Sequence, residues 1–201
     1  MQLKELYETW DVEPLFLATA TNGLDPKKDK VLAVASATAT EEEVPLVFFN
    51  KTLGEDLVKA QRYHQISVEL MTQFGREYTD FVEAVQGRFQ KKILFSYNAP
   101  FQYAFLSALL NEPSMMIYDL TVIEQALRKG LAFTEEELVT PGSFYSACSS
   151  HYYPLPVSTV YKRLNVSKQP PPGELPVEWA VDVLQMLYNG VSSKELSLLE
   201  S

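Results

Sequence analysis

The chain has 201 residues, 46% of them hydrophobic, and a formal net charge of −9 at pH 7. This length and composition predict a single domain with a buried core, spanning residues 1–201. The acidic balance excludes a strong general affinity for nucleic acid, because such affinity depends on basic contacts to phosphates. The acidic balance is nevertheless compatible with a local groove that binds a nucleic-acid strand.

The cysteine content and the hydrophobic pattern indicate a cytoplasmic protein. Cys148 is the one cysteine of the sequence, so no internal disulfide can form, which is typical of a reducing compartment. Residues 1–14 lack the apolar segment of a secretory signal, and no later stretch has the roughly 18 apolar residues of a membrane span. We therefore expect no membrane partner.

The N-terminal part of the chain predicts one helix and three strands. Apolar residues at helical spacing indicate a helix over residues 2–11. Apolar runs bounded by turn residues indicate strands at 14–21, 30–37 and 44–50. Because the connections are short and polar, we expect an antiparallel meander, with the acidic run 41–43 in its second turn.

Further along, the pattern alternates between helices and short strands. Helices are expected at 54–63, 78–89, 101–110 and 175–188, and a strand at 92–96. The segment 129–157, which is rich in Ser, Tyr and Pro, is expected to be an extra loop region. The tail after Gly190 is expected to fray or to form a short helix.

The stretch Pro14–Pro26, PLFLATATNGLDP, carries the most specific signal of the sequence. It resembles the first motif of the DEDD, DnaQ-like (proofreading-type) 3'-5' exonucleases, in which an apolar run is followed by Asp-Thr-Glu-Thr-Thr-Gly-Leu-Asp-Pro. Ala18 and Ala20 stand where the family has its Asp and Glu, and they share one face of the strand. Four matching residues are candidates for lining a substrate groove: Thr19, Thr21, Gly23 and Leu24.

A second stretch, Ser96–Leu106, resembles the second motif of the same family, His-Asn-Ala-x-Phe-Asp-x-x-Phe-Leu. Asn98 and Phe101 match this motif and are further candidates for the groove. Gln102, however, stands at the position of the metal-binding Asp. Asp119 ends a strand that the family also has, and the resemblance implies a structural role for it rather than a metal ligand.

The third family motif, His-x-x-x-x-Asp in the last helix, is harder to place. Asp182 fits the acid of this motif, and Val177 then falls at the position of the His. A rival register through His151 or Tyr152 contains no acid and is followed by too much chain. We adopt the register of Asp182, with a capping, paired or solvent-facing Asp182 as the alternative interpretation.

The resemblance covers about residues 12–190 and implies an α/β, RNase H-like fold: a central mixed sheet with its first three strands antiparallel and helices on both faces. Members of the family hold two divalent cations between four carboxylates and use a His or Tyr as general base. Here Asp182 is the one acid left at these positions, and a single carboxylate cannot hold two metals. We therefore expect no cofactor.

Three hypotheses for the function follow. The first is a catalytically inactive exonuclease-like protein that binds single-stranded nucleic acid or acts as a scaffold. The second is an active nuclease that holds Mg²⁺ or Mn²⁺ with Asp182, Asp119 or Asp25, or the inactivated form of such an enzyme, engineered at Ala18 and Ala20. The third is a purely protein-binding subunit, which the acidic balance favours. A basic lining beside the two alanines would favour nucleic acid, and an acidic or apolar one would favour protein.

Overall fold

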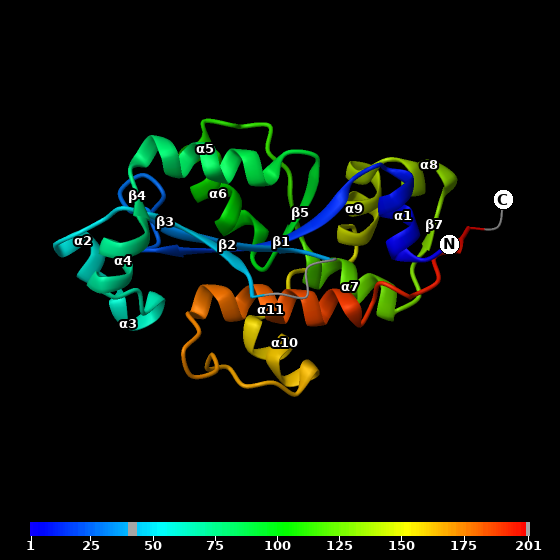
Figure 1. The fold of residues 1–201 in the computed structure, drawn as a ribbon. Coiled ribbons are helices and arrows are strands. Elements are labelled where there is room, and N and C mark those ends of the chain that lie inside the picture. Colours follow the sequence, from blue (N-terminus) through cyan, green and yellow to red (C-terminus); the bar gives the residue numbers. More distant parts are fainter. Residues whose placement is uncertain (40–43, 200–201) are drawn as a thin grey trace.

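The computed structural model describes residues 1–39 and 44–199, and the acidic run predicted as a turn at 41–43 lies outside this part of the chain. Within the described residues, a six-stranded sheet with the order β4-β3-β2-β1-β5-β6 forms the centre of the molecule (Figure 1). Its strands are β1 (Glu13–Thr21), β2 (Val31–Thr38), β3 (Leu46–Asn50), β4 (Gly75–Arg76), β5 (Lys92–Ser96) and β6 (Ile117–Asp119).

The pairing of the strands confirms the predicted mixed sheet. β1 is antiparallel to β2, and β2 is antiparallel to β3, so the first three strands form the expected meander. β5 pairs parallel with β1, and β6 pairs parallel with β5. Parallel neighbours need long crossover connections, and helices supply them here. The carboxyl ends of β1 and β5 therefore lie at the same edge of the sheet.

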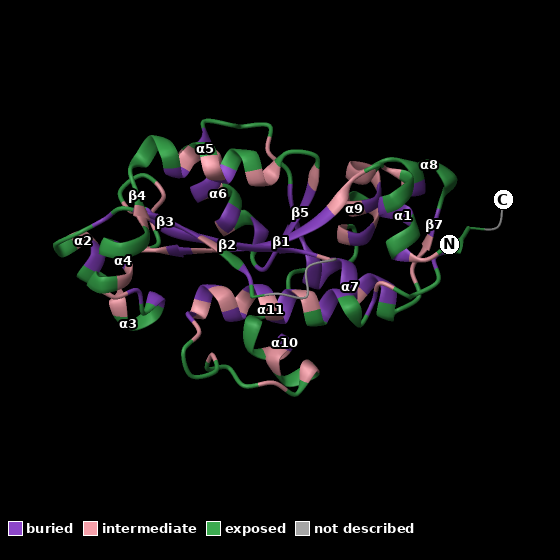
Figure 2. Cartoon of the chain, viewed as in Figure 1, coloured by how far each residue is buried: buried purple, intermediate pink, exposed green. Residues whose placement is uncertain are grey.

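Helices cover both faces of the sheet (Figure 1). One face is covered by α5 (Tyr78–Phe89) and α6 (Ala99–Leu110), which share an apolar cluster with β1, β2 and β3. The other face is covered by α7 (Leu120–Arg128) and α11 (Pro176–Asn189), while α10 (Val157–Leu164) packs against α11 and α1 (Leu3–Thr9) packs against β1. The helix α11 packs directly on β1 and β2, and both strands are buried along most of their length (Figure 2).

The expectation of an extra loop over 129–157 is wrong. This segment forms β7 (Ala132–Phe133), α8 (Glu135–Val139) and α9 (Pro141–Ser149). Thr134 and Glu137 form a capping box that starts α8, and Pro141 starts α9. Phe133 and Phe144 stack with ring centroids 4.9 Å apart and are buried. Burial of these rings against the core therefore stabilises a segment whose helical pattern in the sequence is weak.

The helix expected over 54–63 is divided into α2 (Glu55–Val58) and α3 (Gln61–His64). The division falls at Ala60, whose φ of +61° lies in the left-handed region and ends the first helix. α4 (Val68–Phe74) then leads into β4. The tail is also different from the expectation, because β8 (Ser197–Leu198) pairs with β7 instead of forming a helix. No helix of the described residues is long and apolar enough to cross a membrane.

Candidate functional site

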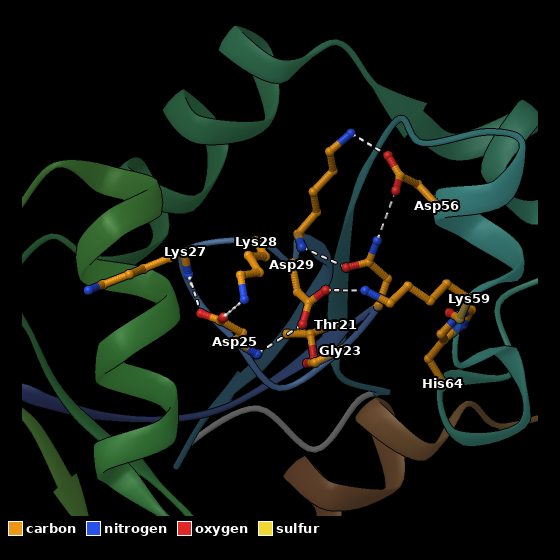
Figure 3. A network of polar contacts seen from close by, with 11 residues as sticks. Thr21, Gly23, Asp25, Lys27, Lys28, Asp29, Asp56, Lys59 and His64 are labelled. Atoms are coloured by element: carbon orange, nitrogen blue, oxygen red, sulfur yellow. Dashed lines mark hydrogen bonds and ion pairs between the residues drawn. The ribbon is translucent and has the colours of Figure 1, made fainter.

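The turn between β1 and β2 is tied to α2 by hydrogen bonds and an ion pair (Figure 3). The side-chain oxygen of Asn22 accepts the backbone N–H of Lys30 at 2.6 Å. The amide nitrogen of Asn22 donates to Asp56 at 3.4 Å, and Lys30 Nζ contacts the other oxygen of Asp56 at 2.5 Å. These contacts hold the end of β1 against α2.

Asp29 organises the same turn from the inside, and its side chain is only 7% exposed (Figure 3). It pairs with Lys59 and accepts the backbone N–H of Asp25 at 2.9 Å. The bond from Lys59, followed by the one from Asp25, lowers the pKa of Asp29 below its ordinary value. A Cβ at Gly23 would lie 2.1 Å from this carboxylate, so a larger residue there would require the Asp29 side chain to move.

Asn98 and Asp119 position the start of α6. Asn98 has a φ of +47°, a left-handed conformation that Asn tolerates better than most residues. Asp119 is fully buried and accepts the N–H of Ala99 at 3.2 Å together with the N–H and hydroxyl of Thr121. The carboxylate thus joins the first turns of α6 and α7, and its hydrogen bonds give it a structural role.

A cavity of about 310 Å³ lies where the end of β1 meets α6, α10 and α11. It is lined by Ala18, Thr19, Ala20, Thr21, Tyr63, His64, Ser96, Tyr97, Asn98, Phe101, Gln102, Val157, Tyr161, Pro176, Val177 and Ala180. The structure therefore brings together Ala18, Ala20, Gln102 and Val177, which come from three separate sequence motifs. None of the sixteen lining residues is an Asp, Glu, Lys or Arg.

Asp182 is not among the described residues that line this cavity. In an α-helix each residue is rotated by about 100° from the last, so Asp182 is turned about 140° away from Val177, whereas Ala180 shares the face of Val177. Burial, followed by the charges of Glu174 and Glu178, raises the pKa of Asp182 to about 6. The acid therefore lies on a side of α11 that faces other acids, away from the two alanines.

Ala180 is the position that the sequence analysis missed. Ala180 stands two residues before Asp182 and lies on the side of α11 that lines the cavity. The spacing of three residues between Val177 and Ala180 could have indicated this arrangement, because residues three apart lie on one side of a helix. Two further lining residues that the motifs did not indicate, Val157 and Tyr161, come from α10.

The predicted groove residues are divided between two adjoining hollows. Thr19, Thr21, Asn98 and Phe101 line the cavity. Gly23 and Leu24 line a second hollow of about 820 Å³, which we call the turn hollow. It lies between the β1–β2 turn and the α2–α3 segment, and it shares Thr21 and Tyr63 with the cavity.

Charge is present in the turn hollow although it is absent from the cavity lining. Lys59 and Arg62 line the turn hollow, and no Asp or Glu is among its described lining residues. The guanidinium of Arg62 lies 4.7 Å from the centroid of the Tyr63 ring and donates to the hydroxyl of Tyr63 at 2.8 Å. Tyr63 is 65% exposed and Leu24 is 83% exposed. The hollow thus presents a basic and partly aromatic surface.

Gln102 carries the most notable polar group of the cavity. Its side-chain oxygen accepts the hydroxyl of Thr19 at 2.8 Å. Its amide nitrogen donates to no group of residues 1–39 and 44–199, although Gln102 is only 7% exposed. The bond from Thr19 therefore fixes the amide while its N–H groups stay available to the cavity.

His64 has no free ring nitrogen. Its Nε2 lies 3.0 Å from the carbonyl of Leu57 and 3.2 Å from that of Lys59, and its Nδ1 accepts the N–H of Ile66 at 3.0 Å. These contacts require the neutral ring with the proton on Nε2. Burial lowers the pKa of His64 below its ordinary value. Because both ring nitrogens are engaged, the ring holds α2 and α3 together and is not placed as a general base.

The residues present do not fit the two-metal centre that the sequence resemblance implies. Hard divalent cations need several oxygen ligands, usually with carboxylates among them. At the positions that the resemblance assigns to metal ligands, the cavity has two methyl groups, at Ala18 and Ala20, and the neutral amide of Gln102. In the part of the chain that the structure describes, no three His, Cys, Asp or Glu side chains are grouped so that they could hold a metal ion.

The remaining chemically interesting residues lie elsewhere. Asp25 belongs to the β1–β2 turn, where its carboxylate lies 3.3 Å from Lys28 Nζ. Cys148 is fully buried, and burial raises the pKa of its thiol to about 12, which suppresses the reactive thiolate. His151 and Tyr152, which define the rival register of the third motif, are not among the described residues that line the cavity.

Comparison with known proteins supports the fold. No family model and no curated protein matches the sequence. Among solved structures, E. coli exonuclease I in complex with a dA16 oligonucleotide aligns with a TM-score of 0.56 and 15% identity, over 90% of this chain and 41% of that chain. Exonuclease I from Methylocaldum szegediense aligns with a TM-score of 0.58 and 14% identity, over 89% of this chain and 40% of that chain.

A complex of exonuclease I named for SSB-Ct aligns with a TM-score of 0.56 and 14% identity, over 90% of this chain and 42% of that chain. The chain therefore spans about two fifths of the length of these three structures. At these identities the likeness shows the fold: an α/β domain with a mixed sheet of the exonuclease I type.

Proposed function

We propose that this chain is a catalytically inactive exonuclease-like domain that keeps a groove for single-stranded nucleic acid. One observation carries the proposal. Four of the five positions that the sequence resemblance assigns to catalysis, namely Ala18, Ala20, Gln102 and Val177, line one cavity, and that cavity has no carboxylate among its described lining residues. Metal-dependent hydrolysis of a phosphodiester would need those carboxylates to hold its cations.

The alternative hypothesis of an active nuclease would need Asp182, Asp119 or Asp25 as metal ligands, and the positions of these three acids support the inactive domain instead. Asp119 is engaged by the starts of α6 and α7. Asp25 pairs with Lys28 in the turn, and Asp182 lies on another side of α11. None of the three is among the described residues lining the cavity. The proposed domain therefore works without Mg²⁺ or Mn²⁺.

The lining beside Ala18 and Ala20 contains no Lys or Arg, which by itself favours a protein ligand, whereas the adjoining turn hollow supports nucleic acid as the ligand. Exposed aromatic rings stack with bases of any sequence, and basic side chains beside them meet the phosphates. Tyr63, with Arg62 over its ring, offers this combination, and Leu24 adds an exposed apolar contact. The structural neighbours include an exonuclease bound to an oligonucleotide. We place the protein in the cytoplasm, where its single free thiol, Cys148, stays reduced.

The test combines metal titration, cleavage and strand binding. Calorimetric titration of MnCl₂ into the protein should give no binding heat, and labelled single-stranded DNA and RNA should stay intact in its presence. The labelled strand should nevertheless bind, and Arg62→Ala should weaken binding several-fold, because a cation and a stacking contact are lost. Tight Mn²⁺ binding with trimming from the 3' end would refute the proposal, and so would an intact strand that does not bind.

A protein-binding role is the second candidate, and one surface favours it. An open apolar hollow of about 280 Å³ lies beside β6 and the start of α6, and Tyr103, Met115 and Met116 are among its lining residues. Methionine-rich surfaces adapt to apolar partner segments, and one structural neighbour is named for a complex with SSB-Ct. This second role replaces the first if the protein binds no single-stranded DNA or RNA but binds a partner protein, and if Met116→Lys abolishes that binding.

A further inference from the structure

We propose that the cavity beside Ala18 and Ala20 binds an uncharged heteroaromatic ring of nucleoside size, with the side-chain amide of Gln102 as its hydrogen-bond donor. The inference rests on the proposed function, because it assigns a ligand to a site that no longer holds metal. It differs from that function in predicting selection against phosphate groups.

The lining of the cavity offers no cation to an anionic ligand. A phosphate taken out of water must be met by cations, metals or several N–H donors, since an unpaired buried charge is very costly. None of the described lining residues is Lys or Arg, and the neutral ring of His64 has both its nitrogens engaged. The methyl groups of Ala18 and Ala20 leave apolar surface at the end of β1. A neutral ligand meets no such penalty.

Gln102 supplies a side-chain donor that has no partner in the described chain and stays accessible from the cavity. Its oxygen is already used by Thr19, so the amide can offer its N–H groups but not its acceptor. A ligand that accepts this hydrogen bond replaces the water that would otherwise accept it. The matching ligand group is a ring carbonyl or a ring nitrogen.

The aromatic walls and the size define the rest of the ligand. Phe101, Tyr97 and Tyr161 line the cavity, and their rings offer flat faces to a planar molecule. The volume of about 310 Å³ lies at the lower end of the range for small-molecule sites. Nucleosides combine a planar ring, carbonyl or ring-nitrogen acceptors and a neutral sugar within this size.

The test uses uridine and uridine 5'-monophosphate as probes in calorimetric and ligand-observed NMR titrations of the whole chain. Uridine should bind, and the monophosphate should bind at least about tenfold more weakly, because its charge has no partner in the cavity. Gln102→Met, which keeps the length of the side chain and removes the donor, should weaken uridine binding about tenfold. Gln86→Met, at an exposed glutamine of α5, is the matched control and should leave uridine binding unchanged.

The outcomes separate this inference from the proposed function. Absence of uridine binding at millimolar concentration, or equal or tighter binding of the monophosphate, would overturn the inference even if oligonucleotides bind without cleavage. Uridine binding that survives Gln102→Met would overturn the role of Gln102. Since the comparison of the two probes uses the unmodified protein, a variant that fails to fold does not decide the result.

Discussion

Two alanine side chains determine the chemistry of the cavity. Ala18 and Ala20 are each 6% exposed, and they lie on β1 beside the start of α6 and the face of α11 that carries Ala180. Four carboxylates at such a spot repel one another unless cations hold them together. Their absence removes both this repulsion and the capacity to bind the cations.

Restoring the acids tests this account directly. The combined variant Ala18→Asp, Ala20→Glu, Gln102→Asp and Ala180→Asp should lower the melting temperature in EDTA by about 4 to 8 °C, because like charges are brought together. Millimolar MnCl₂ should recover much of the loss by binding only the folded state. Thermal unfolding with and without metal measures both effects.

The neutral analogue of this variant, with Asn or Gln at the same four positions, is its matched control and should show no response to metal. The unmodified protein should also melt at the same temperature in EDTA and in MnCl₂. A restored variant that melts identically in both solutions would show that these four positions do not form a metal site.

Asp182 predicts a pH dependence of stability. Its pKa in the folded protein, about 6, lies above the ordinary 3.8, so between these pH values the folded state binds more protons than the unfolded state. Its contribution to stability is therefore present below pH 4 and is lost as the pH rises through 6. Asp182→Asn should raise the free energy of unfolding at pH 7 by up to about 1 kcal/mol, since water screens a half-exposed group.

Urea unfolding of the Asp182→Asn variant and the parent at pH 4 and pH 7 measures this difference. The two proteins should differ much less at pH 4, where the parent's Asp182 is protonated in the folded state and about half protonated in the unfolded state. Destabilisation by the substitution at pH 7 would mean that the carboxylate has a favourable partner there.

Among the elements, the β1–β2 turn and the α2–α3 segment act as one unit. Asn22, Asp29 and His64 each join two parts of this unit through hydrogen bonds or ion pairs. Gln65 ends α3 with a φ of +56°, a left-handed conformation that glycine adopts more readily than other residues.

Gly23→Ala should destabilise this unit. The new methyl group would collide with the carboxylate of Asp29, which must then leave Lys59, and we expect a loss of about 1 to 3 kcal/mol in the free energy of unfolding. Gly87→Ala in α5 is the matched control, because no atom lies within 4 Å of its added Cβ, and it should stabilise by about 1 kcal/mol. Chemical unfolding measures both; equal effects would contradict the crowding at Gly23.

For the whole molecule, contacts between the two ends of the described chain add to the central sheet. The N–H of Leu196 donates to the carbonyl of Met1 at 2.9 Å, and the amino group of Met1 pairs with Glu195 at 3.1 Å. The N–H of Lys4 donates to the carbonyl of Ser192. Together with the pairing of β7 and β8, these contacts bring α1 and the tail to one end of the molecule (Figure 1).

Leu196→Ala should test whether the tail contributes to global stability. Leu196 is 8% exposed and belongs to the main core cluster, so its truncation should cost about 2 kcal/mol. Leu199→Ala, at a residue that is 56% exposed, should change stability by less than about 0.5 kcal/mol. If thermal and urea unfolding show the same small effect for both, the tail does not fold cooperatively with the rest.

The elements with strong local patterns could be predicted well. The helix 78–89 and the strand 92–96 have the predicted bounds, because each carries a clear apolar period or run between turn residues. α7 was missed because Leu120 follows directly on the last residue of β6 without a turn signal. α8 and α9 were missed because their helical pattern is weak, and burial of residues such as Phe144 stabilises them instead.

The sequence by itself determined the type of fold and the meander, because short-range patterns and motif spacing contain this information. Only the tertiary structure decided which face of α11 meets the sheet. Since packing of α11 on β1 and β2 sets its rotation, Ala180 points to the cavity and Asp182 does not. The bond from Thr19 to Gln102 joins residues 83 positions apart, and no local pattern could have shown it.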